Sequence, residues 1–290
     1  MKIKTPAKIN LALDVTGKLE NGYHTIESVF QTVGLYDEIE VTLNNSGINI
    51  TCELPADFAK ADPIPCDERN IAYKAAKLFS ETTGYSGGCD IHIVKGIPSQ
   101  AGMGGGSTDA AAVLYCLNSL TGSKLENADL AAMGKKLGAD VPFFFTGGTA
   151  YVEGIGEKIT SLPDYSGRVL VIAKGTEGVS TAEAYANIDA LTSPLHPPVH
   201  ELVNTLKSNS EDAYNYFGNL FEQAVQLKEV DEIKSVMTDN GSLKAVMTGS
   251  GSAVFGLFSS TEKAKVCAEK LREKSYFAAV CMTVADTFLE

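Results

Sequence analysis

The residues best suited to chemistry form a glycine-rich stretch between a predicted strand and a predicted helix. Glycine fills four of the five positions from 102 to 106, and Ser107 follows. Glycine tolerates positive φ angles and lets the backbone come close to a ligand. The free N–H groups of a first helical turn favour an anion. The stretch therefore predicts a phosphate-binding loop made by Pro98, Ser99, Gln100, Ala101, Gly102, Met103, Gly104, Gly105, Gly106, Ser107 and Thr108.

This loop differs from two familiar phosphate loops. No G-x-x-x-x-G-K-[ST] occurs in the chain, which excludes a Walker A loop, and no G-x-G-x-x-G fits the register of a dinucleotide-binding fingerprint. A flexible surface turn is the simpler interpretation. However, turns seldom place four glycines directly before a capped helix. The pattern therefore favours a phosphate site of another class.

Two charged residues elsewhere could serve a phosphoryl transfer. Asp140 lies between a predicted helix end and Val141-Pro142, where proline holds the preceding backbone extended. Lys8 directly precedes a predicted strand. Phosphoryl transfer to an alcohol needs a base near the acceptor hydroxyl and cations that neutralise the spreading charge. Taken alone, Asp140 equally suits a turn, and Lys8 equally suits an exposed strand position.

The elements that must position these residues mix strands and helices. Patterns of apolar residues predict strands over residues 9–15, 39–43, 90–94, 168–173, 253–258 and 277–284. They predict helices over residues 70–82, 107–120, 127–137 and 261–274. Asn127 is expected to cap the third helix, and Gly138 to end it. Because regular βαβα alternation is missing, we expect an α+β fold with a domain boundary between residues 158 and 159.

Composition excludes several classes of protein. The net charge of −12 argues against a nucleic-acid partner, which needs a basic face. Six cysteines occur without a C-x-x-C pair or zinc spacing, as expected of reduced thiols in the cytosol. No apolar segment resembles a signal peptide, and no apolar run approaches the roughly 20 residues that cross a bilayer. We therefore expect a cytoplasmic protein without membrane contact, as a monomer or weak homodimer.

Two further segments accompany the glycine-rich loop, namely Pro6-Ala7-Lys8-Ile9-Asn10-Leu11 and Thr248-Gly249-Ser250-Gly251-Ser252-Ala253. With the loop, they resemble the three motifs of the GHMP kinase superfamily, which includes galactokinase, homoserine kinase and mevalonate kinase. The resemblance implies a ribosomal protein S5 domain 2-like N-terminal domain over residues 1–158 and a ferredoxin-like C-terminal domain over residues 159–290. It also implies that the loop wraps the ATP phosphates and that Gly249, Ser250 and Gly251 brace the loop.

Within this superfamily, the chain is most similar to the kinases that phosphorylate the 2-hydroxyl of 4-diphosphocytidyl-2-C-methyl-D-erythritol in the non-mevalonate pathway of isoprenoid biosynthesis. Gly22-Tyr23-His24 is the discriminating element. Asn21, Met103 and Thr108 differ from the residues usual in that branch, but these changes remove no group that the chemistry needs. The alternatives are another GHMP enzyme, against which Gly22-Tyr23-His24 argues, and a non-catalytic nucleotide-binding protein.

The resemblance also assigns roles around the acceptor. It implies that Asp140 takes the proton of the acceptor hydroxyl and that Lys8 lies beside it, pointing to the transferring phosphoryl group. A neighbouring ammonium would keep the carboxylate ionised. It further implies that Asn10 lies near the diphosphate of the substrate. At the base, it implies that His24 contacts the cytosine edge beside Tyr23, and that Phe30 or Tyr185 stacks on the ring.

On the nucleotide side, the resemblance implies ATP as the phosphoryl donor. Asn70 and Lys95 match family positions near the nucleotide. Mg²⁺ would be bound mainly through the ATP phosphates, with Ser107 as a candidate contact, because the sequence contains no dedicated metal cage.

Overall fold

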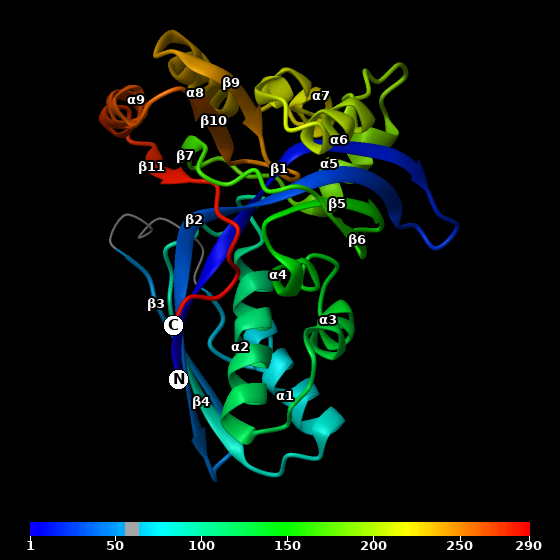
Figure 1. The fold of residues 1–290 in the computed structure, drawn as a ribbon, viewed down its shortest axis with the longest axis vertical. Helices are drawn as coiled ribbons and strands as arrows, with labels where there is room; N and C mark the ends of the chain where they lie inside the picture. The colour runs from blue at the N-terminus through cyan, green and yellow to red at the C-terminus, as the bar shows by residue number, and fades with distance from the viewer. Residues whose placement is uncertain (56–63) are drawn as a thin grey trace.

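The computed structural model describes residues 1–55 and 64–290. In this part of the chain, the strands form one sheet of seven strands and a second sheet of four. The strands β1 (Lys2–Lys18) and β2 (His24–Asn44) link the two halves of the molecule. Figure 1 shows both spanning the lower half, where the termini lie, and the upper half, where most of the C-terminal elements lie, with β1 and β2 antiparallel.

β1 is buried at every residue from Thr5 to Val15. It pairs antiparallel with β2 along most of its length, and the register shifts between Pro6 and Ala7 and again after Asn10. Proline cannot donate to a ladder, so its place at an irregularity is expected. The apolar pattern predicted residues 9–15, which lie within this buried run, but it missed residues 2–8 at the start of the strand and the exposed residues 16–18 at its end.

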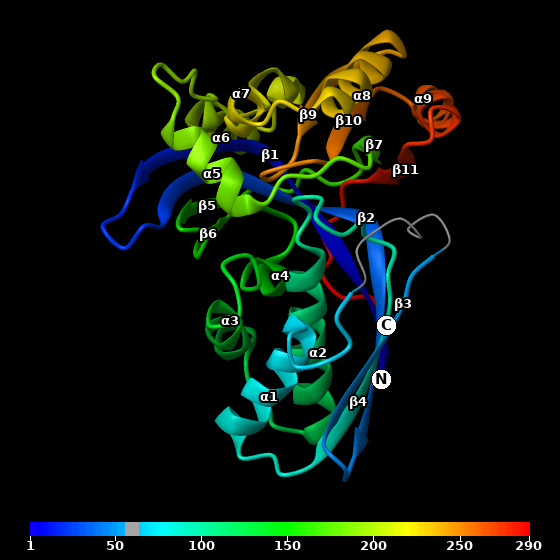
Figure 2. The same cartoon turned by 180° about the vertical axis from the view of Figure 1, so that it is seen from behind.

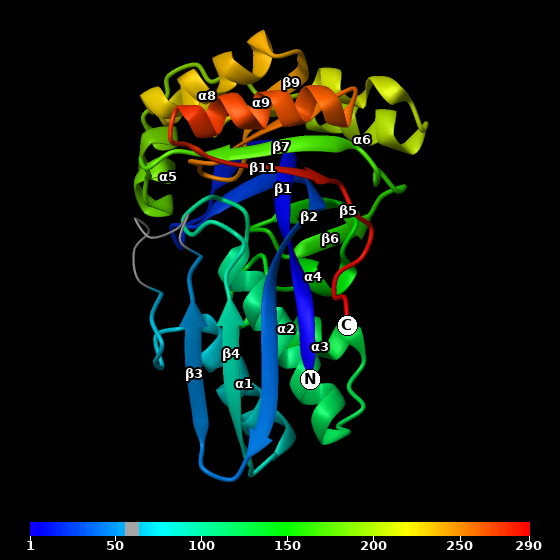
Figure 3. The ribbon, with the colours of Figure 1, turned by 90° about the vertical axis from the view of Figure 1, so that its left-hand side faces the viewer.

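β2 divides the larger sheet. Its residues 26–31 pair with β5 (Thr149–Gly154), whereas its residues 38–44 pair with β4 (Gly88–Val94). Three further strands complete the sheet, namely β3 (Ile48–Glu53) beside β4, β6 (Lys158–Ser161) beside β5 and β8 (Gly218–Asn219) beside β1. Figure 3 shows β3, β4, β2 and β1 side by side in the lower half.

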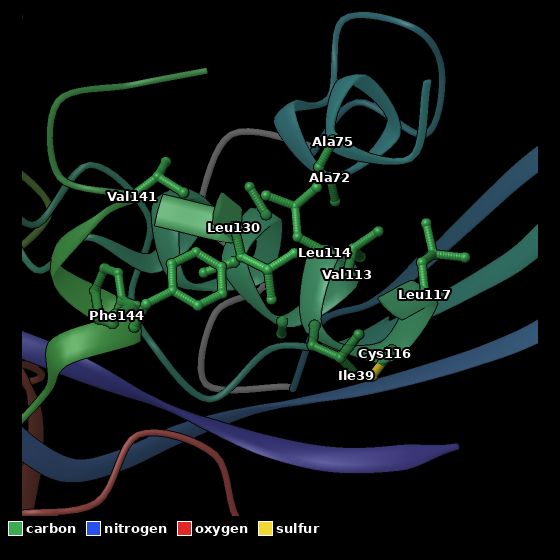
Figure 4. Packing of buried hydrophobic residues seen from close by; sticks show 14 of the residues in the cluster. Ile39, Ala72, Ala75, Val113, Leu114, Cys116, Leu117, Leu130, Val141 and Phe144 are labelled. Atoms are coloured by element: carbon green, nitrogen blue, oxygen red, sulfur yellow. The ribbon is translucent and has the colours of Figure 1, made fainter. Parts of the chain in front are cut away.

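Helices α1 (Ile71–Thr83), α2 (Gly105–Thr121) and α3 (Asn127–Lys135) lie on one side of this sheet (Figure 2). The alanines at positions 110–112 are fully buried and keep α2 slim where it packs. Figure 4 shows Leu114 and Val113 of α2 in the core close to Ala72 and Ala75 of α1. Burying a side chain such as Leu114 contributes about 1.5–3 kcal/mol to folding. This packing fixes the start of α2, and with it the phosphate-binding loop.

The smaller sheet has the strand order β11 (Phe277–Met282), β7 (Val169–Lys174), β10 (Val254–Phe258), β9 (Ser242–Met247), and all neighbours are antiparallel. Helices α8 (Lys228–Asp239) and α9 (Thr261–Glu273) cover its outer face (Figure 3). The first of the four strands in the chain thus lies between the fourth and the third, as in a ferredoxin-like βαββαβ unit. The expected α+β class and ferredoxin-like C-terminal domain are confirmed.

The remaining helices are α4 (Phe143–Thr146), α5 (Thr181–Asp189), α6 (Val199–Lys207), the 3₁₀ helix η2 (Glu211–Tyr216) and α7 (Phe221–Ala224). Of these, α5 bears most directly on the site below. No helix within residues 1–55 and 64–290 is both long and apolar enough to pass through a bilayer.

Several predicted boundaries are wrong. The cap of α3 is Glu126 rather than Asn127, because the Asp129 carboxylate accepts the Glu126 backbone N–H at 3.1 Å. α3 also ends at Lys135, two residues before the predicted end. α2 begins at Gly105 instead of Ser107, because helical glycines carry no propensity signal. The domain boundary between residues 158 and 159 stays a prediction; β6, which starts at Lys158, pairs with β5 of the larger sheet.

Candidate active site

The phosphate-binding loop leads directly into α2. Gly104, the residue before the helix, has a φ of 71°, and no side chain caps α2. The first helical bond runs from the Thr108 N–H to the Gly104 carbonyl at 2.8 Å. Within the described residues, the N–H groups of Gly105, Gly106 and Ser107 have no acceptor. An uncapped helix start with three such donors is well suited to a phosphate.

The C-terminal motif touches the loop through glycine. A Cβ atom on Gly249 would lie 2.7 Å from the Gly102 Cα atom and 2.8 Å from its carbonyl oxygen. Gly249 also has a φ of 59°, a conformation that other residues adopt at a cost. Asn219 holds this turn from behind, because its Nδ2 donates to the carbonyl oxygens of Met247 at 2.7 Å and Gly249 at 2.8 Å. Thr248 and Gly249 therefore lie in close backbone contact with the loop at Gly102, and a bracing role for Ser250 and Gly251 stays a prediction.

Gly249→Ala should lower the free energy of unfolding by about 1–3 kcal/mol and raise the KM for ATP, because the new methyl group overlaps the Gly102 backbone. Gly122→Ala is the matched control. Gly122 has a φ of 66°, but a Cβ atom added there would meet nothing within 4 Å, so this variant carries only the conformational cost. Urea unfolding and ATP titration measure both effects. Equal behaviour of the two variants would remove the bracing role from Gly249.

Lys8 and Asp140 meet although 132 positions separate them in the chain. The Lys8 Nζ atom lies 3.5 Å from Oδ2 of Asp140, and 4.4 Å from the centre of the Phe30 ring. The Lys8 side chain is only 4% exposed, whereas the Asp140 side chain is 32% exposed. The ammonium is thus buried, while the carboxylate lines an open cavity. This pair has the charges that a base and a charge-stabilising cation require.

Asn10 holds Lys8 and the C-terminal motif together. Its Oδ1 accepts hydrogen bonds from Lys8 Nζ at 2.8 Å, from the Gly249 N–H at 3.0 Å and from Thr248 Oγ1 at 3.2 Å. Its Nδ2 donates to Ser28 Oγ at 2.9 Å. All polar atoms of this side chain therefore have protein partners. The structure gives Asn10 a positioning role, and the predicted substrate contact stays a prediction.

The Gly-Tyr-His element lies at the far end of the same cavity. Tyr23 is 62% exposed, and His24 stacks on Tyr185 of α5 with ring centres 4.6 Å apart at an angle of 16°. Burial raises the pKa of Tyr185 to about 12. Phe30 is 1% exposed and packs its edge against Phe143. Phe30 and Tyr185 are the two rings predicted to stack on a base, and Tyr185 is the more accessible of them. The exposed ring of Tyr23 is a third candidate for this stacking.

A cavity of about 810 Å³ connects these parts. Its wall includes the pair Lys8 and Asp140, the loop residues Gly102, Gly104 and Ser107, and also Tyr23, His24 and Tyr185. A second cavity of about 440 Å³ lies on the other side of the loop and is lined by residues 98–107 with Asn70 and Lys95. Because the loop borders both, a phosphate held by it would face Lys8 and Asp140. Thr108 lies outside both cavity walls, with its hydroxyl against that of Thr5.

Lys95 lies in a buried charge cluster behind the loop. Its Nζ atom contacts Asp37 and, at 2.8 Å, the Asp109 carboxylate. Burial lowers the pKa of Lys95, but the two carboxylates more than offset this and raise it. Burial raises the pKa of Asp109 well above its ordinary value, against the pull of Lys95. Lys95 therefore supports the start of α2, and its predicted contact with the nucleotide stays a prediction.

The polar side-chain atoms of Asn70 likewise have partners within the protein. Its Oδ1 accepts from the Ala72 N–H at 2.9 Å and caps α1, and its Nδ2 donates to the Pro65 carbonyl at 2.8 Å. It lines the smaller cavity with the loop. As for Lys95, a contact with the nucleotide stays a prediction.

Sequence reasoning missed four polar residues of the site, because each acts through a tertiary contact that no local pattern marks. They are Asp37 and Asp109 behind the loop, Asn219 behind the C-terminal motif, and Asp189 opposite His24. Asp109 follows the glycine stretch by three residues, so its position alone could have drawn attention. The other three carry no local signal.

Comparison with known proteins shows the family to which the chain belongs. The family described as "GHMP kinases N terminal domain" matches residues 70–148, and "GHMP kinases C terminal" matches residues 192–276. A protein of Clostridium botulinum (strain Eklund 17B) named 4-diphosphocytidyl-2-C-methyl-D-erythritol kinase is 42% identical over 98% of this chain and 100% of its own length. A protein of Clostridium tetani with the same name is 42% identical over 94% of this chain and 96% of its own length.

Solved structures give the same result. A crystal structure of 4-(cytidine 5'-diphospho)-2C-methyl-D-erythritol kinase superposes with a TM-score of 0.81 at 32% identity, covering 98% of this chain and 100% of that one. Homoserine kinase from Cytophaga hutchinsonii superposes with a TM-score of 0.75 at 21% identity, covering 99% and 95%, and shares the fold. By its two domain matches and its full-length relatives, the chain belongs to the GHMP kinases and, among them, to the 4-diphosphocytidyl-2-C-methyl-D-erythritol kinase family.

Proposed function

We propose that the chain transfers the γ-phosphoryl group of ATP to the 2-hydroxyl of 4-diphosphocytidyl-2-C-methyl-D-erythritol, a step of the non-mevalonate pathway of isoprenoid biosynthesis. The observation that carries this proposal is the position of Lys8 and Asp140. The pair lines one cavity together with the phosphate-binding loop and the Gly-Tyr-His element. A non-catalytic nucleotide-binding protein would have no use for a buried lysine beside a carboxylate that faces the cavity.

In this proposal, Asp140 accepts the proton of the acceptor hydroxyl as that oxygen attacks the γ-phosphorus. Lys8 neutralises part of the charge that spreads over the phosphoryl oxygens in the transition state. The burial of Lys8 strengthens this effect, because the local dielectric constant is low. Asn10 keeps Nζ in place through the bond at 2.8 Å, so little reorganisation is needed when the substrates bind.

The N–H groups at the start of α2 hold the phosphates, and residues 98–107 form the nucleotide side. Mg²⁺ would lower the charge of the phosphates and align them. The residues present suit a cation held mainly by phosphate: the Ser107 side chain lies at the helix start between the two cavities. In the described part of the chain, no group of three or more His, Cys, Asp and Glu residues could hold a metal ion. Ser107 is therefore the proposed protein contact of the cation.

The domain bounds and the oligomeric state complete the proposal. The N-terminal domain comprises residues 1–158 and binds ATP, and the C-terminal domain comprises residues 159–290. The chain acts as a monomer or weak homodimer in this proposal.

The direct test is ADP release, measured in a coupled assay with ATP and 4-diphosphocytidyl-2-C-methyl-D-erythritol. Homoserine and mevalonate serve as alternative acceptors, because other GHMP kinases share the fold. Turnover with either of these, and none with the cytidine compound, would overturn the proposal.

The uridine analogue of the acceptor should be used at least about 10²-fold less efficiently, as kcat/KM, than the cytidine compound. Uracil carries a carbonyl where cytosine carries an amino group, so a buried polar group would be left unpaired. His24→Ala should raise the KM of the cytidine compound and reduce this preference. Equal use of both analogues by the wild-type enzyme would contradict the assignment of a cytidine substrate. A preference that survives His24→Ala would contradict only the role of His24.

A further inference from the structure

The last residue of α5, Asp189, closes the base end of the larger cavity. Its Oδ1 lies 2.7 Å from Nε2 of His24, and its Oδ2 lies 2.5 Å from Nζ of Lys18. Lys18 ends β1 and His24 begins β2, so one carboxylate holds both ends of the hairpin. All three side chains line the cavity that also contains Asp140.

The position of Asp189 is unfavourable for its own helix. A carboxylate at a helix C-terminus opposes the macrodipole, and the last turn of α5 contains no basic residue. Residues that break a local rule often do so for a function. Here, the contacts with Lys18 and His24 lower the pKa of Asp189, so its carboxylate is ionised near neutral pH.

An ionised carboxylate only accepts hydrogen bonds. Nε2 of His24 must therefore carry the proton of their shared hydrogen bond. In a neutral imidazole, the other nitrogen then carries a lone pair. Among the described residues, no group donates to Nδ1 of His24.

α5 also fixes the plane of the His24 ring. Tyr185 lies four residues before Asp189, on the same face of the helix, and stacks on the imidazole at 16°. The rings of Phe221 and Tyr185 in turn pack nearly perpendicular to each other, with centres 5.0 Å apart. One helix therefore sets both the orientation of the imidazole and the position of its proton.

We propose that Asp189 is a positioning residue that fixes the tautomer of His24 and thereby sets the preference of the acceptor site for cytosine over uracil. This inference rests on the proposed function, in which His24 contacts the base. An acceptor nitrogen pairs with the exocyclic amino group of cytosine and repels the carbonyl at the same position of uracil. Asp189 itself touches neither reacting atom.

The test is the ratio of kcat/KM for the cytidine and uridine acceptors in Asp189→Asn. An asparagine can turn its amide and donate to Nε2, so both tautomers become accessible. The ratio should fall by about tenfold, mainly through KM, while kcat with the cytidine compound stays within a few-fold of wild type. Glu183→Gln, on the exposed side of the same helix, is the matched control and should leave the ratio unchanged.

Lys18→Met separates this role from a simple link between the hairpin and α5. This substitution removes the ion pair between Lys18 and Asp189 but leaves the Asp189 carboxylate on His24. It should therefore weaken the binding of both acceptors equally and change the ratio of their kcat/KM values by less than about threefold. Equal losses of preference in Lys18→Met and Asp189→Asn would assign the effect to the link. An unchanged ratio in folded Asp189→Asn would overturn the proposal.

Nitrogen-15 NMR of the imidazoles gives a readout independent of turnover. Wild-type His24, assigned by the loss of its signals in His24→Ala, should show protonated Nε2 and unprotonated Nδ1 at neutral pH. A proton on Nδ1 would refute the proposal even if Asp189→Asn failed to fold. If the wild-type enzyme used both analogues equally, the contact of His24 with the base would fail, while this spectrum would still decide the tautomer.

Discussion

Asp140→Asn is expected to lower kcat by about 10²–10⁴-fold and to leave the KM of both substrates nearly unchanged. The amide has almost the same shape as the carboxylate, but it cannot accept the proton of the acceptor hydroxyl. The change removes the counter-charge of the buried Lys8 ammonium, but Lys8 Nζ keeps its hydrogen bond to Asn10 Oδ1 at 2.8 Å and the new amide still offers an oxygen, so the fold should persist. Steady-state assays with purified variant, with circular dichroism as a check on folding, measure the effect.

Asp164→Asn is the matched control for this variant. Asp164 is an exposed turn residue that accepts a hydrogen bond from the Ser166 N–H at 2.9 Å, and it lies outside the walls of both cavities. Its substitution should leave kcat unchanged. A folded Asp140→Asn enzyme with near-normal kcat would contradict the assignment of Asp140 as the base, although the family assignment would stand.

The fold was predictable where the sequence pattern is local. The helix expected at 261–274 appears as α9 (Thr261–Glu273), and the helix expected at 70–82 appears as α1 (Ile71–Thr83). Both have apolar residues on one face and a side-chain cap. Failures occurred where packing overrides pattern. β1 extends through the exposed residues 16–18, beyond its apolar run, because this end still pairs with β2, and α2 starts at glycines, whose conformation is set by the contacts of the loop.

The site was predictable only in part, for a related reason. Lys8, His24 and the loop lie within segments that carry family motifs, so the resemblance located them. Asp189 and Asn219 are ordinary polar residues in the sequence, and their roles follow from contacts across 165 and 30 positions, respectively. Such contacts are set by tertiary packing, which no periodicity encodes.

The chain is acidic, although its proposed substrates are anions. A chain of net charge −12 has to attract a triphosphate and a diphosphate. The proposed anion site consists of backbone N–H groups at the start of α2 and one lysine that is nearly fully buried. These donors act at short range and in a low dielectric, where the distant surface carboxylates are screened by salt. We therefore expect local donors, and not the net charge, to decide phosphate binding.

Lys8→Met is expected to lower kcat by about 10²–10³-fold, the usual loss when one preorganised donor to the transition state is removed. Methionine keeps most of the length of the lysine stem and can still pack on Phe30. Asn10 Oδ1 retains the Gly249 N–H and Thr248 Oγ1 as donors, so no buried acceptor is left empty. Lys4→Met on the same strand is the matched control, because Lys4 is exposed and pairs only with Glu38 among the described residues.

The double variant Lys8→Met/Asp140→Asn tests whether the two residues act as one unit. Independent effects would multiply, so the losses in kcat would combine to about 10⁴–10⁷-fold. The 3.5 Å separation predicts a smaller loss, close to that of the more damaging single variant, because each group depends on the other. The Lys8 ammonium stabilises the ionised form of Asp140, which accepts the proton. Once Asp140 has accepted the proton it is neutral, and the positive charge of Lys8 is then free to stabilise the phosphoryl oxygens. Strictly multiplicative losses, measured from single-turnover rates at saturating substrate, would show that Lys8 binds phosphate without assisting Asp140.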